Sequence, residues 1–140
     1  MGSQKSGSMV VPDIVNGRVF IRIGGVDLDL APFTEFSGYT FHKVDFSGLS
    51  LVSCKFVDVR FEGCRFRTTE LSHSTFTRTT FDNCDFTDAS APWTCFDSCG
   101  FTSTCLTKSR FAYAVLKNCS LSNCTLNGSR IDRKSTRLNS

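Results

Sequence analysis

A chain of 140 residues with a formal net charge of +3 holds one ordinary domain and lacks the strong positive charge of a nucleic-acid-binding surface. No apolar run approaches the roughly twenty residues of a membrane span, and residues 1–11 lack the apolar core of a signal peptide. With two histidines and no dense carboxylate cluster, we expect neither an enzyme nor a cofactor.

The N-terminal part of the chain divides into a polar start and an apolar cap. Residues 1–12 open with the Gly/Ser-rich run MGSQKSGS and are expected to be disordered. Residues 13–40 alternate apolar and polar residues on both sides of Gly24-Gly25, which predicts a β-hairpin. We expect this hairpin to cover the first coil of the repeat that follows, because the end of a solenoid is otherwise an open strand edge. The repeat phase can be followed back through Phe36, so cap and first coil can overlap near residue 40.

From Phe41 to Ile131 every fifth residue is apolar, with eleven Phe, six Leu, one Ile and one Ala in this series. A period of five matches neither a helix, at 3.6, nor a strand, at 2, and therefore indicates a repeat. A second series, two residues before the first, consists mostly of Cys, Ser, Thr and Ala. The phenylalanines that we expect to form the core are Phe41, Phe46, Phe56, Phe61, Phe66, Phe76, Phe81, Phe86, Phe96, Phe101 and Phe111.

Both series are expected to point inward, so that each five-residue unit makes one side of a square coil. Four sides close a coil of about twenty residues, and coils stack at the sheet spacing of about 4.8 Å. Residues twenty apart, such as Phe56, Phe76 and Phe96, then lie above one another. Each buried ring contributes roughly 1.5–3 kcal/mol relative to exposure. The pattern predicts an all-β quadrilateral β-helix over residues 41–131, with about four to five coils.

This pattern resembles that of the pentapeptide-repeat family, whose fold is a right-handed quadrilateral β-helix. The resemblance covers Phe41 to Ile131. The commonest form of the repeat has Leu at its centre, preceded by Asp or Asn. This chain prefers Phe, and the preceding residue is acidic only at Asp45, Glu70 and Asp85.

One unit of the repeat is irregular, because its central residue is Ala91 and Pro92 and Trp93 follow. Phe96 is again in phase, so the repeat continues. Trp93 falls at an outward position on an otherwise polar wall. A loop or bulge is the simpler interpretation, since single exposed apolar residues are common, and a binding spot is the alternative.

The cysteines divide between two kinds of position. Six occupy the small inward position, where a free thiol packs as a compact hydrophobe: Cys54, Cys64, Cys84, Cys99, Cys119 and Cys124. Cys95 and Cys105 face outward, and no Cys-x-x-Cys pair occurs, so we expect no metal site. Cys64/Cys84 and Cys99/Cys119 stack one coil apart, which leaves disulfides as the alternative to the buried thiols that we favour.

The other polar residues show no catalytic pattern. His42 and His73 lie outward on different units and are interpreted as surface histidines. Asp82, Asp85 and Asp88 fall at different corners, unlike the ligands of a calcium loop, and are interpreted as a solvated face.

Three N-glycosylation sequons lie close together, at Asn118, Asn123 and Asn127. All three asparagines are outward by register, as a glycan requires. They favour a protein of the secretory pathway, and the alternative is chance in a repeat rich in Asn, Ser and Thr. We expect less modification at Asn127, because the hydroxyl of its sequon belongs to the inward residue Ser129.

The last nine residues, 132–140, leave the five-residue register. Their sequence DRKSTRLNS resembles the translation of a common sequencing adapter, and we interpret it as a non-native tail that interrupts the natural sequence. A disordered basic tail is the alternative.

A more specific resemblance is to the luminal pentapeptide-repeat domain of the synaptic vesicle glycoprotein 2 family, transporter-like membrane proteins of the major facilitator type. It lies in FSGLSLVSCKFVDVRFEGCRF (Phe46–Phe66), DNCDFTDASAPWTCFDSCGF (Asp82–Phe101) and VLKNCSLSNCTL (Val115–Leu126). The resemblance implies a glycosylated domain in the vesicle lumen or outside the cell, held between two transmembrane helices. This chain contains neither helix, so its contact with a membrane would run through segments outside it.

The resemblance implies a non-enzymatic interaction domain of such a transporter, with protein partners on the faces of the solenoid and no nucleic acid. The alternative is a soluble, cytoplasmic pentapeptide-repeat protein that acts as a protein-binding scaffold. The topoisomerase-shielding type mimics DNA and needs an acidic surface, whereas this repeat has ten Lys and Arg against eight Asp and Glu. Fold alone does not decide between these functions.

Overall fold

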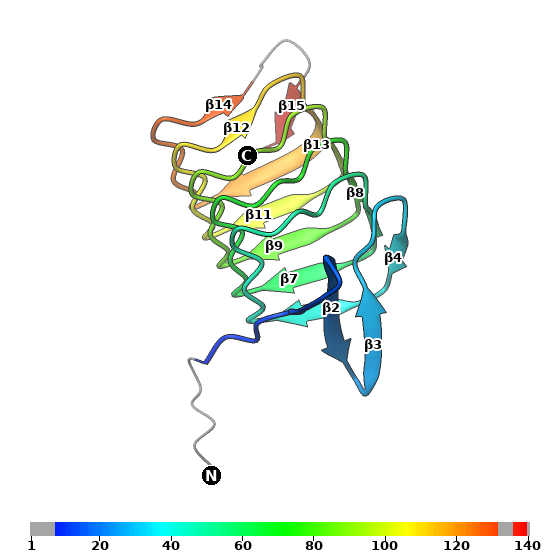
Figure 1. Ribbon diagram of the computed structural model, residues 1–140. Coiled ribbons are helices and arrows are strands. Elements are labelled where there is room, and N and C mark those ends of the chain that lie inside the picture. Colours follow the sequence, from blue (N-terminus) through cyan, green and yellow to red (C-terminus); the bar gives the residue numbers. More distant parts are fainter. Residues whose placement is uncertain (1–7, 132–135, 140) are drawn as a thin grey trace.

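The computed structural model describes residues 8–131 and 136–139. Its ribbon winds as a right-handed solenoid of about five coils, and all of the described elements are strands (Figure 1). The all-β solenoid predicted from the five-residue period is thus confirmed. Within the described residues no helix is long and apolar enough to cross a membrane.

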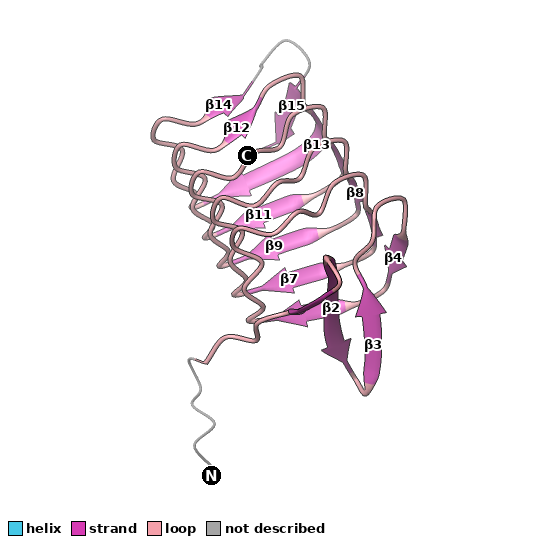
Figure 2. Ribbon diagram, in the orientation of Figure 1, coloured by secondary structure: helices cyan, strands magenta, loops and turns pink. Residues whose placement is uncertain are grey.

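The strands form an N-terminal hairpin unit and the walls of the solenoid (Figure 2). The hairpin unit is antiparallel and consists of β1 (Asp13–Val15), β2 (Arg18–Ile23) and β3 (Val26–Asp29). One wall stacks β4 (Glu35–Ser37), β6 (Lys55–Val57), β8 (Thr75–Thr77), β10 (Cys95–Asp97) and β13 (Val115–Ser122). The next wall stacks β5 (Thr40–His42), β7 (Arg60–Glu62), β9 (Thr80–Asp82), β11 (Gly100–Thr102) and again β13. The remaining strands are β12 (Arg110–Phe111), β14 (Arg130–Ile131) and β15 (Thr136–Asn139).

Neighbouring coils pair in parallel with an offset of twenty residues. Phe56 pairs with Phe76, and Phe76 pairs with Phe96. The third wall is held by single bridges such as Asp45↔Arg65, and part of the fourth by bridges such as Ser50↔Glu70. Because every rung repeats the same offset, each side chain has its counterpart directly above and below it, and the surface consists of vertical columns.

The core is a set of stacked phenylalanine columns. Each of the eleven phenylalanines at central positions between residues 41 and 111 has at most 1% of its surface exposed. Within a column the rings are nearly parallel, as for Phe56 and Phe76, whose centroids lie 4.9 Å apart at 5°. Rings of adjacent columns meet edge to face, as Phe76 and Phe81 do at 5.5 Å. Both geometries are those that aromatic pairs prefer, so the columns act as one continuous core.

The small inward side chains are hydrogen-bonded as well as packed. Thr69 Oγ1 donates to the Phe46 carbonyl at 2.8 Å, and Cys64 Sγ donates to the Phe41 carbonyl at 3.2 Å. In both cases the acceptor is the central residue 23 positions earlier, one coil below. The inward hydroxyls and thiols therefore tie adjacent coils together, which a purely apolar side chain would not do.

Two thiols of the wall, those of Cys54 and Cys84, favour the neutral form. All eight cysteines are free thiols. Burial raises the pKa of Cys54 to about 11. The pKa of Cys84 is also raised, by its hydrogen bond to Cys64 and by burial. These two buried sulfurs are therefore poor nucleophiles near neutral pH.

The corners of the coils have left-handed backbone conformation. Every fifth residue from Phe33 to Gly128, two positions after each central residue, has a φ between 45° and 76°. Gly, Asn and Asp adopt this region most readily, whereas a bulky residue there costs roughly 1–2 kcal/mol. A large side chain at a corner is therefore placed against the preference of its backbone.

Ile21 and Leu28 of the hairpin unit belong to the same hydrophobic core as the phenylalanines of the solenoid. The coil itself begins before residue 41, because β4 already pairs with β6 in the regular register. Order also extends into the segment expected to be disordered: the Val10 amide donates to the Lys43 carbonyl at 2.7 Å, and the Asp45 amide donates to Val10. The first coil would otherwise expose these backbone groups. Residues 1–7 of that segment lie outside the described residues.

The tail expected to be non-native is described only at β15, which pairs with β13. Leu116 pairs with Thr136 at the regular offset of twenty, but Cys119 pairs with Leu138, so the register shifts between them. Residues 132–135 and 140 lie outside the described part of the chain.

Candidate docking surface

An exposed stack of rings runs along one corner of the solenoid. Residues 33, 53, 73, 93 and 113 lie one coil apart in a single corner column, and four of them are ring-bearing: Phe33, His73, Trp93 and Tyr113. The His73 and Trp93 rings stack with centroids 5.3 Å apart at 5°, and those of Trp93 and Tyr113 at 5.3 Å and 8°. We call this column, with Ser53, the aromatic corner.

The rings of the aromatic corner face solvent. The exposed fraction is 89% for Phe33, 54% for Trp93 and 67% for Tyr113, and His73 is exposed as well. Trp93 is thus not an isolated apolar residue, as its sequence position suggested, but the middle of a three-ring stack. Stacking already restricts the rotamers of these side chains, so they lose less conformational entropy on contact with a partner than ordinary surface side chains do.

The unit around Ala91 is regular, and its interpretation as a loop or bulge is wrong. Ala91 is fully buried in phase with the other central residues. The Trp93 amide donates to the Ala112 carbonyl at 3.0 Å, and the His73 amide donates to the Pro92 carbonyl at 3.1 Å. Pro92 fits because its carbonyl takes part in the ladder and its position requires no donor.

The aromatic corner is also the one described corner column without Lys, Arg, Asp or Glu. Each of the other three columns contains charged residues. One contains Asp58 and Arg78, the second contains Lys43, and the third contains Asp88 and Lys108. The residues that flank Trp93 and Tyr113 along the chain are uncharged, with Pro92 and Ala112 on one side and Cys95 and Val115 on the other, and Arg130 lies beyond them in a groove with Tyr113. The surface therefore combines exposed aromatic area with a lack of charge, which is the composition of an interface centre.

The left-handed backbone of the aromatic corner makes large side chains there energetically unfavourable. The φ values at Phe33, His73, Trp93 and Tyr113 are 66°, 63°, 54° and 60°. A bulky residue in this region costs roughly 1–2 kcal/mol, whereas a stacked pair returns about 0.5–1.5 kcal/mol. Asn or Gly at these corners would therefore give the same or greater stability.

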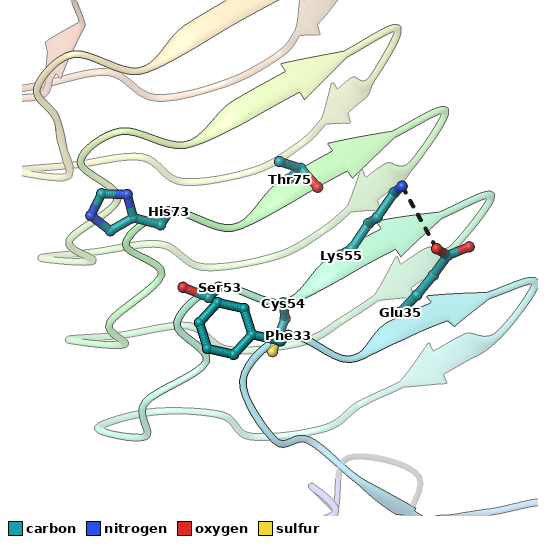
Figure 3. Close-up of a pocket in the computed structure, with 7 residues that line it drawn as sticks. All are labelled: Phe33, Glu35, Ser53, Cys54, Lys55, His73 and Thr75. Carbon is teal, nitrogen blue, oxygen red and sulfur yellow. Dashed lines mark ion pairs between the residues drawn. The ribbon is translucent and has the colours of Figure 1, made fainter.

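An open groove of about 520 Å³ lies at the N-terminal end of the aromatic corner (Figure 3). Phe33, Ser53, Cys54 and His73 line it along the corner. Glu35 and Lys55 lie to the side and form an ion pair, with Lys55 Nζ 3.7 Å from Glu35 Oε1. The groove thus has aromatic walls and a rim whose two opposite charges offset each other.

The aspartates and histidines considered in the sequence analysis do not form a common site in the structure. Asp82 ends β9, Asp88 lies at a corner, and Asp85 accepts a hydrogen bond from the Thr87 amide at 3.0 Å. His42 lies 3.5 Å from Glu62, far along the chain from His73 in the aromatic corner. Among residues 8–131 and 136–139, no three His, Cys, Asp or Glu side chains are grouped so that they could hold a metal ion.

A second groove, lined by charged residues, is neutralised by its own ion pair. Arg78 Nε donates to Asp58 Oδ1 at 2.8 Å. This hydrogen bond lowers the pKa of Asp58 and raises that of Arg78. The groove holds both charges and shows no excess of either sign for a ligand to match.

The asparagines of the sequons are all exposed. Asn118 and Asn123 are left-handed corner residues, with φ of 55° and 56°, and Asn123 Nδ2 donates to Ser103 Oγ at 3.2 Å. Asn127 is also exposed, but the hydroxyl of Ser129 donates to the Leu126 carbonyl at 2.8 Å. Cys95 and Cys105, expected to face outward, are partly exposed.

The aromatic corner was not recognised in the sequence, although one signal was present. When the sequence is divided into units of five residues, consecutive corner residues belong to different columns, and the column of rings does not appear. Reading in steps of twenty places Phe33, His73, Trp93 and Tyr113 in one column, interrupted only by Ser53.

Comparisons with known proteins support the repeat and the fold. Residues 64–102 match the family model described as pentapeptide repeats, in eight copies. QnrB1, a plasmid-mediated fluoroquinolone resistance protein, has a similar structure, with a TM-score of 0.52 and 18% identity over 74% of this chain and 72% of that one. The pentapeptide-repeat protein Rfr23 from the cyanobacterium Cyanothece 51142 aligns with a TM-score of 0.41 and 12% identity, over 76% of this chain and 88% of that one. At 18% identity the likeness to QnrB1 concerns the fold alone.

No curated protein matches the chain. The resemblance to the luminal domain of the synaptic vesicle glycoprotein 2 family therefore rests on the short sequence stretches alone.

Proposed function

We propose that this pentapeptide-repeat β-helix is a non-enzymatic protein-binding scaffold, and that the aromatic corner is its docking surface. The observation that carries the proposal is the exposed, uncharged stack of His73, Trp93 and Tyr113, with ring centroids 5.3 Å apart. Aromatic residues are enriched and charges depleted at the centres of protein interfaces, where Trp and Tyr dominate the binding energy.

The shape of the solenoid suits such a role. The corner is a ridge in which the amides of Phe33, Ser53, His73 and Trp93 each donate to a carbonyl of the next coil. From His73 to Tyr113 each coil adds one ring, so this part of the ridge presents three rings with centroids 5.3 Å apart. A partner segment lying along the ridge would contact several rings at once without any change in the scaffold.

A purely binding role is consistent with the chemistry of the described side chains. The buried thiols of Cys54 and Cys84 have raised pKa values, so both are neutral near pH 7 and poor nucleophiles. Asp58 at the second groove is paired with Arg78, and Glu35 at the rim of the first groove is paired with Lys55. We therefore assign the surface to recognition and not to catalysis.

Site-specific photo-crosslinking tests the proposal. The crosslinking residue p-benzoylphenylalanine replaces Tyr113 in the aromatic corner or, as the matched control, Lys108 at another corner with nearly the same φ (60° and 57°). We expect a discrete crosslinked protein from the source cells at position 113 but not at 108. Excess unlabelled wild-type protein should compete for this product, whereas excess Trp93→Asn protein should not. Equal labelling at both positions, or competition by the variant, would contradict the assignment.

A second candidate is a luminal or extracellular interaction domain of a membrane transporter. The observation that favours it is the exposure of all three sequon asparagines, Asn118, Asn123 and Asn127. This location would leave the aromatic corner available, because Asn118 and Asn123 lie at other corners. Expression through a eukaryotic secretory pathway, followed by enzymatic deglycosylation and mass measurement, tests it. The absence of glycan at all three sites would favour a cytoplasmic scaffold.

A further inference from the structure

The aromatic corner lacks one ring. Its column carries rings at positions 33, 73, 93 and 113, but position 53 is a serine with the same left-handed backbone, at φ 56°. Ring contacts join His73 to Trp93 and Trp93 to Tyr113, whereas Phe33 and His73, two coils apart, make none within the described residues. The 520 Å³ groove lies at this interruption (Figure 3).

Along the column, one ring is missing between Phe33 and His73. Coils rise by about 4.8 Å, so Phe33 and His73 are anchored about twice that distance apart. The neighbouring rings of the same column stack at 5.3 Å. A ring at the level of Ser53 would therefore lie at stacking distance from one ring below and one above, and a second ring would not fit between them.

The electrostatics of the groove restrict its occupant further. The charges at its rim are Glu35 and Lys55, which already pair with each other at 3.7 Å. The floor contains the thiol of Cys54, whose pKa burial raises to about 11, so that it is neutral near pH 7. A charged group entering the groove would lose hydration without gaining an unpaired opposite charge. An uncharged segment matches the groove and the uncharged ridge that continues from it.

We propose that the space over Ser53 binds one aromatic side chain, presented on an uncharged segment of a partner protein. The ring inserts between Phe33 and His73 and completes the column from position 33 to position 113. This inference rests on the proposed function of the aromatic corner and specifies how a partner is recognised there. An aromatic residue is favoured over an aliphatic one of similar size because two of the side chains that line the groove, Phe33 and His73, are rings, and aromatic pairs gain more than their buried area.

Titration of the full-length protein with single-residue probes tests the inference directly. Backbone amide shifts are followed by NMR during addition of N-acetyl-L-tryptophanamide or N-acetyl-L-leucinamide. We expect the tryptophan probe to shift the amides of Ser53 and His73 and to bind about three- to tenfold more tightly than the leucine probe. Equal affinities, or shifts confined to Trp93 and Tyr113, would overturn the inference.

Two variants distinguish specific binding in the groove from non-specific binding of the probe to the surface. Ser53→Trp supplies the missing ring from the chain itself and should abolish the probe-induced shift at His73. Ser98→Trp, at another corner with φ of 59°, adds the same ring elsewhere and should leave binding at the groove unchanged. If Ser53→Trp does not fold, Phe33→Ser serves instead, because Phe33 is 89% exposed and contributes little to the core. Its affinity for the tryptophan probe should fall at least threefold, and unchanged affinity would overturn the inference.

The outcome is distinguishable from that of the proposed function. If a partner still crosslinks at position 113 in the Ser53→Trp protein with undiminished yield, the inference fails and the docking surface remains. If the tryptophan probe binds over Ser53 but no partner crosslinks at position 113, the inference about the groove holds and the proposed function fails. Sedimentation showing a wild-type dimer that Ser53→Trp abolishes would overturn the inference by identifying the occupant as a second copy of this chain.

Discussion

Replacing Phe81 by alanine should destabilise the fold more than the same change at a phenylalanine with fewer ring neighbours. Phe81 is fully buried and stacks on Phe61 at 5.1 Å and on Phe101 at 4.8 Å. Its edge contacts reach four further rings in the adjacent columns, those of Phe66, Phe76, Phe86 and Phe96. The hole left by Phe81→Ala is therefore walled by six rings.

The size of the stability loss depends on how far the six surrounding rings can move into the cavity. Phe→Ala in a core costs about 3–5 kcal/mol, and the upper value applies where the surroundings cannot collapse. Every neighbouring ring of Phe81 is itself held by a backbone rung above and below, so we expect about 4–5 kcal/mol. Phe111 is the matched control. It is 1% exposed, has one ring contact, to Phe96, and has the small Ala91 in the coil below. Phe111→Ala should cost about 3 kcal/mol.

Equilibrium unfolding in urea measures both variants. With an m value of about 2 kcal/mol per M, Phe81→Ala should lower the midpoint by about 2 M, and Phe111→Ala by about 1.5 M. A loss below about 1 kcal/mol for Phe81→Ala would show that the columns are not packed as described. A larger loss for Phe111→Ala than for Phe81→Ala would refute the argument from ring contacts even if both variants are destabilised.

Three further changes test other parts of the molecule. Because burial raises the pKa of Cys54 from 9.0 to about 11, the contribution of its neutral thiol is present below pH 9 and is lost as pH rises toward 11. Wild-type stability should therefore fall about 2 kcal/mol more than that of Cys54→Ala between pH 8 and 11, and parallel urea midpoints would contradict this. Trp93→Asn should change the free energy of unfolding by less than about 1 kcal/mol, because Asn accepts the left-handed corner; a larger loss in thermal unfolding would make Trp93 structural. In a secretory host, Asn118 and Asn123 should carry glycan and Asn127 less, with Asn→Gln variants and mass shifts assigning each site; glycan at Asn127 alone would exclude the register argument.

The fold was predictable because its core is periodic in the sequence. A five-residue spacing of Phe and Leu over ninety residues is satisfied by a square coil, and the offset of twenty follows from four sides per coil. This offset led directly to the stacking of Phe56, Phe76 and Phe96. The overlap of the cap with the first coil near Phe36 was less clear, because a strand that closes a solenoid and one that covers it have the same alternation.

The corner residues were harder to interpret. Left-handed backbone is usually signalled by Gly, Asn or Asp, and several corners do carry them, such as Asn83 and Gly63. At Trp93 and Tyr113 the large side chain conceals this signal, because such residues normally avoid positive φ. Trp93 was therefore interpreted as part of an irregularity, although its backbone is the same as at every other corner.

The amino-acid sequence by itself determined which residues are buried and how far apart along the chain the stacked residues lie, because burial of Phe and Leu depends on a short repeating pattern. Only the tertiary structure decided which outward residues share a column. Surface neighbours such as His73 and Trp93 are twenty residues apart, and their contact depends on the rise and twist of successive coils. The same holds for the thiols, whose inward position was predictable but whose hydrogen bonds to carbonyls one coil below, as between Cys64 and Phe41, depend on the stacking distance.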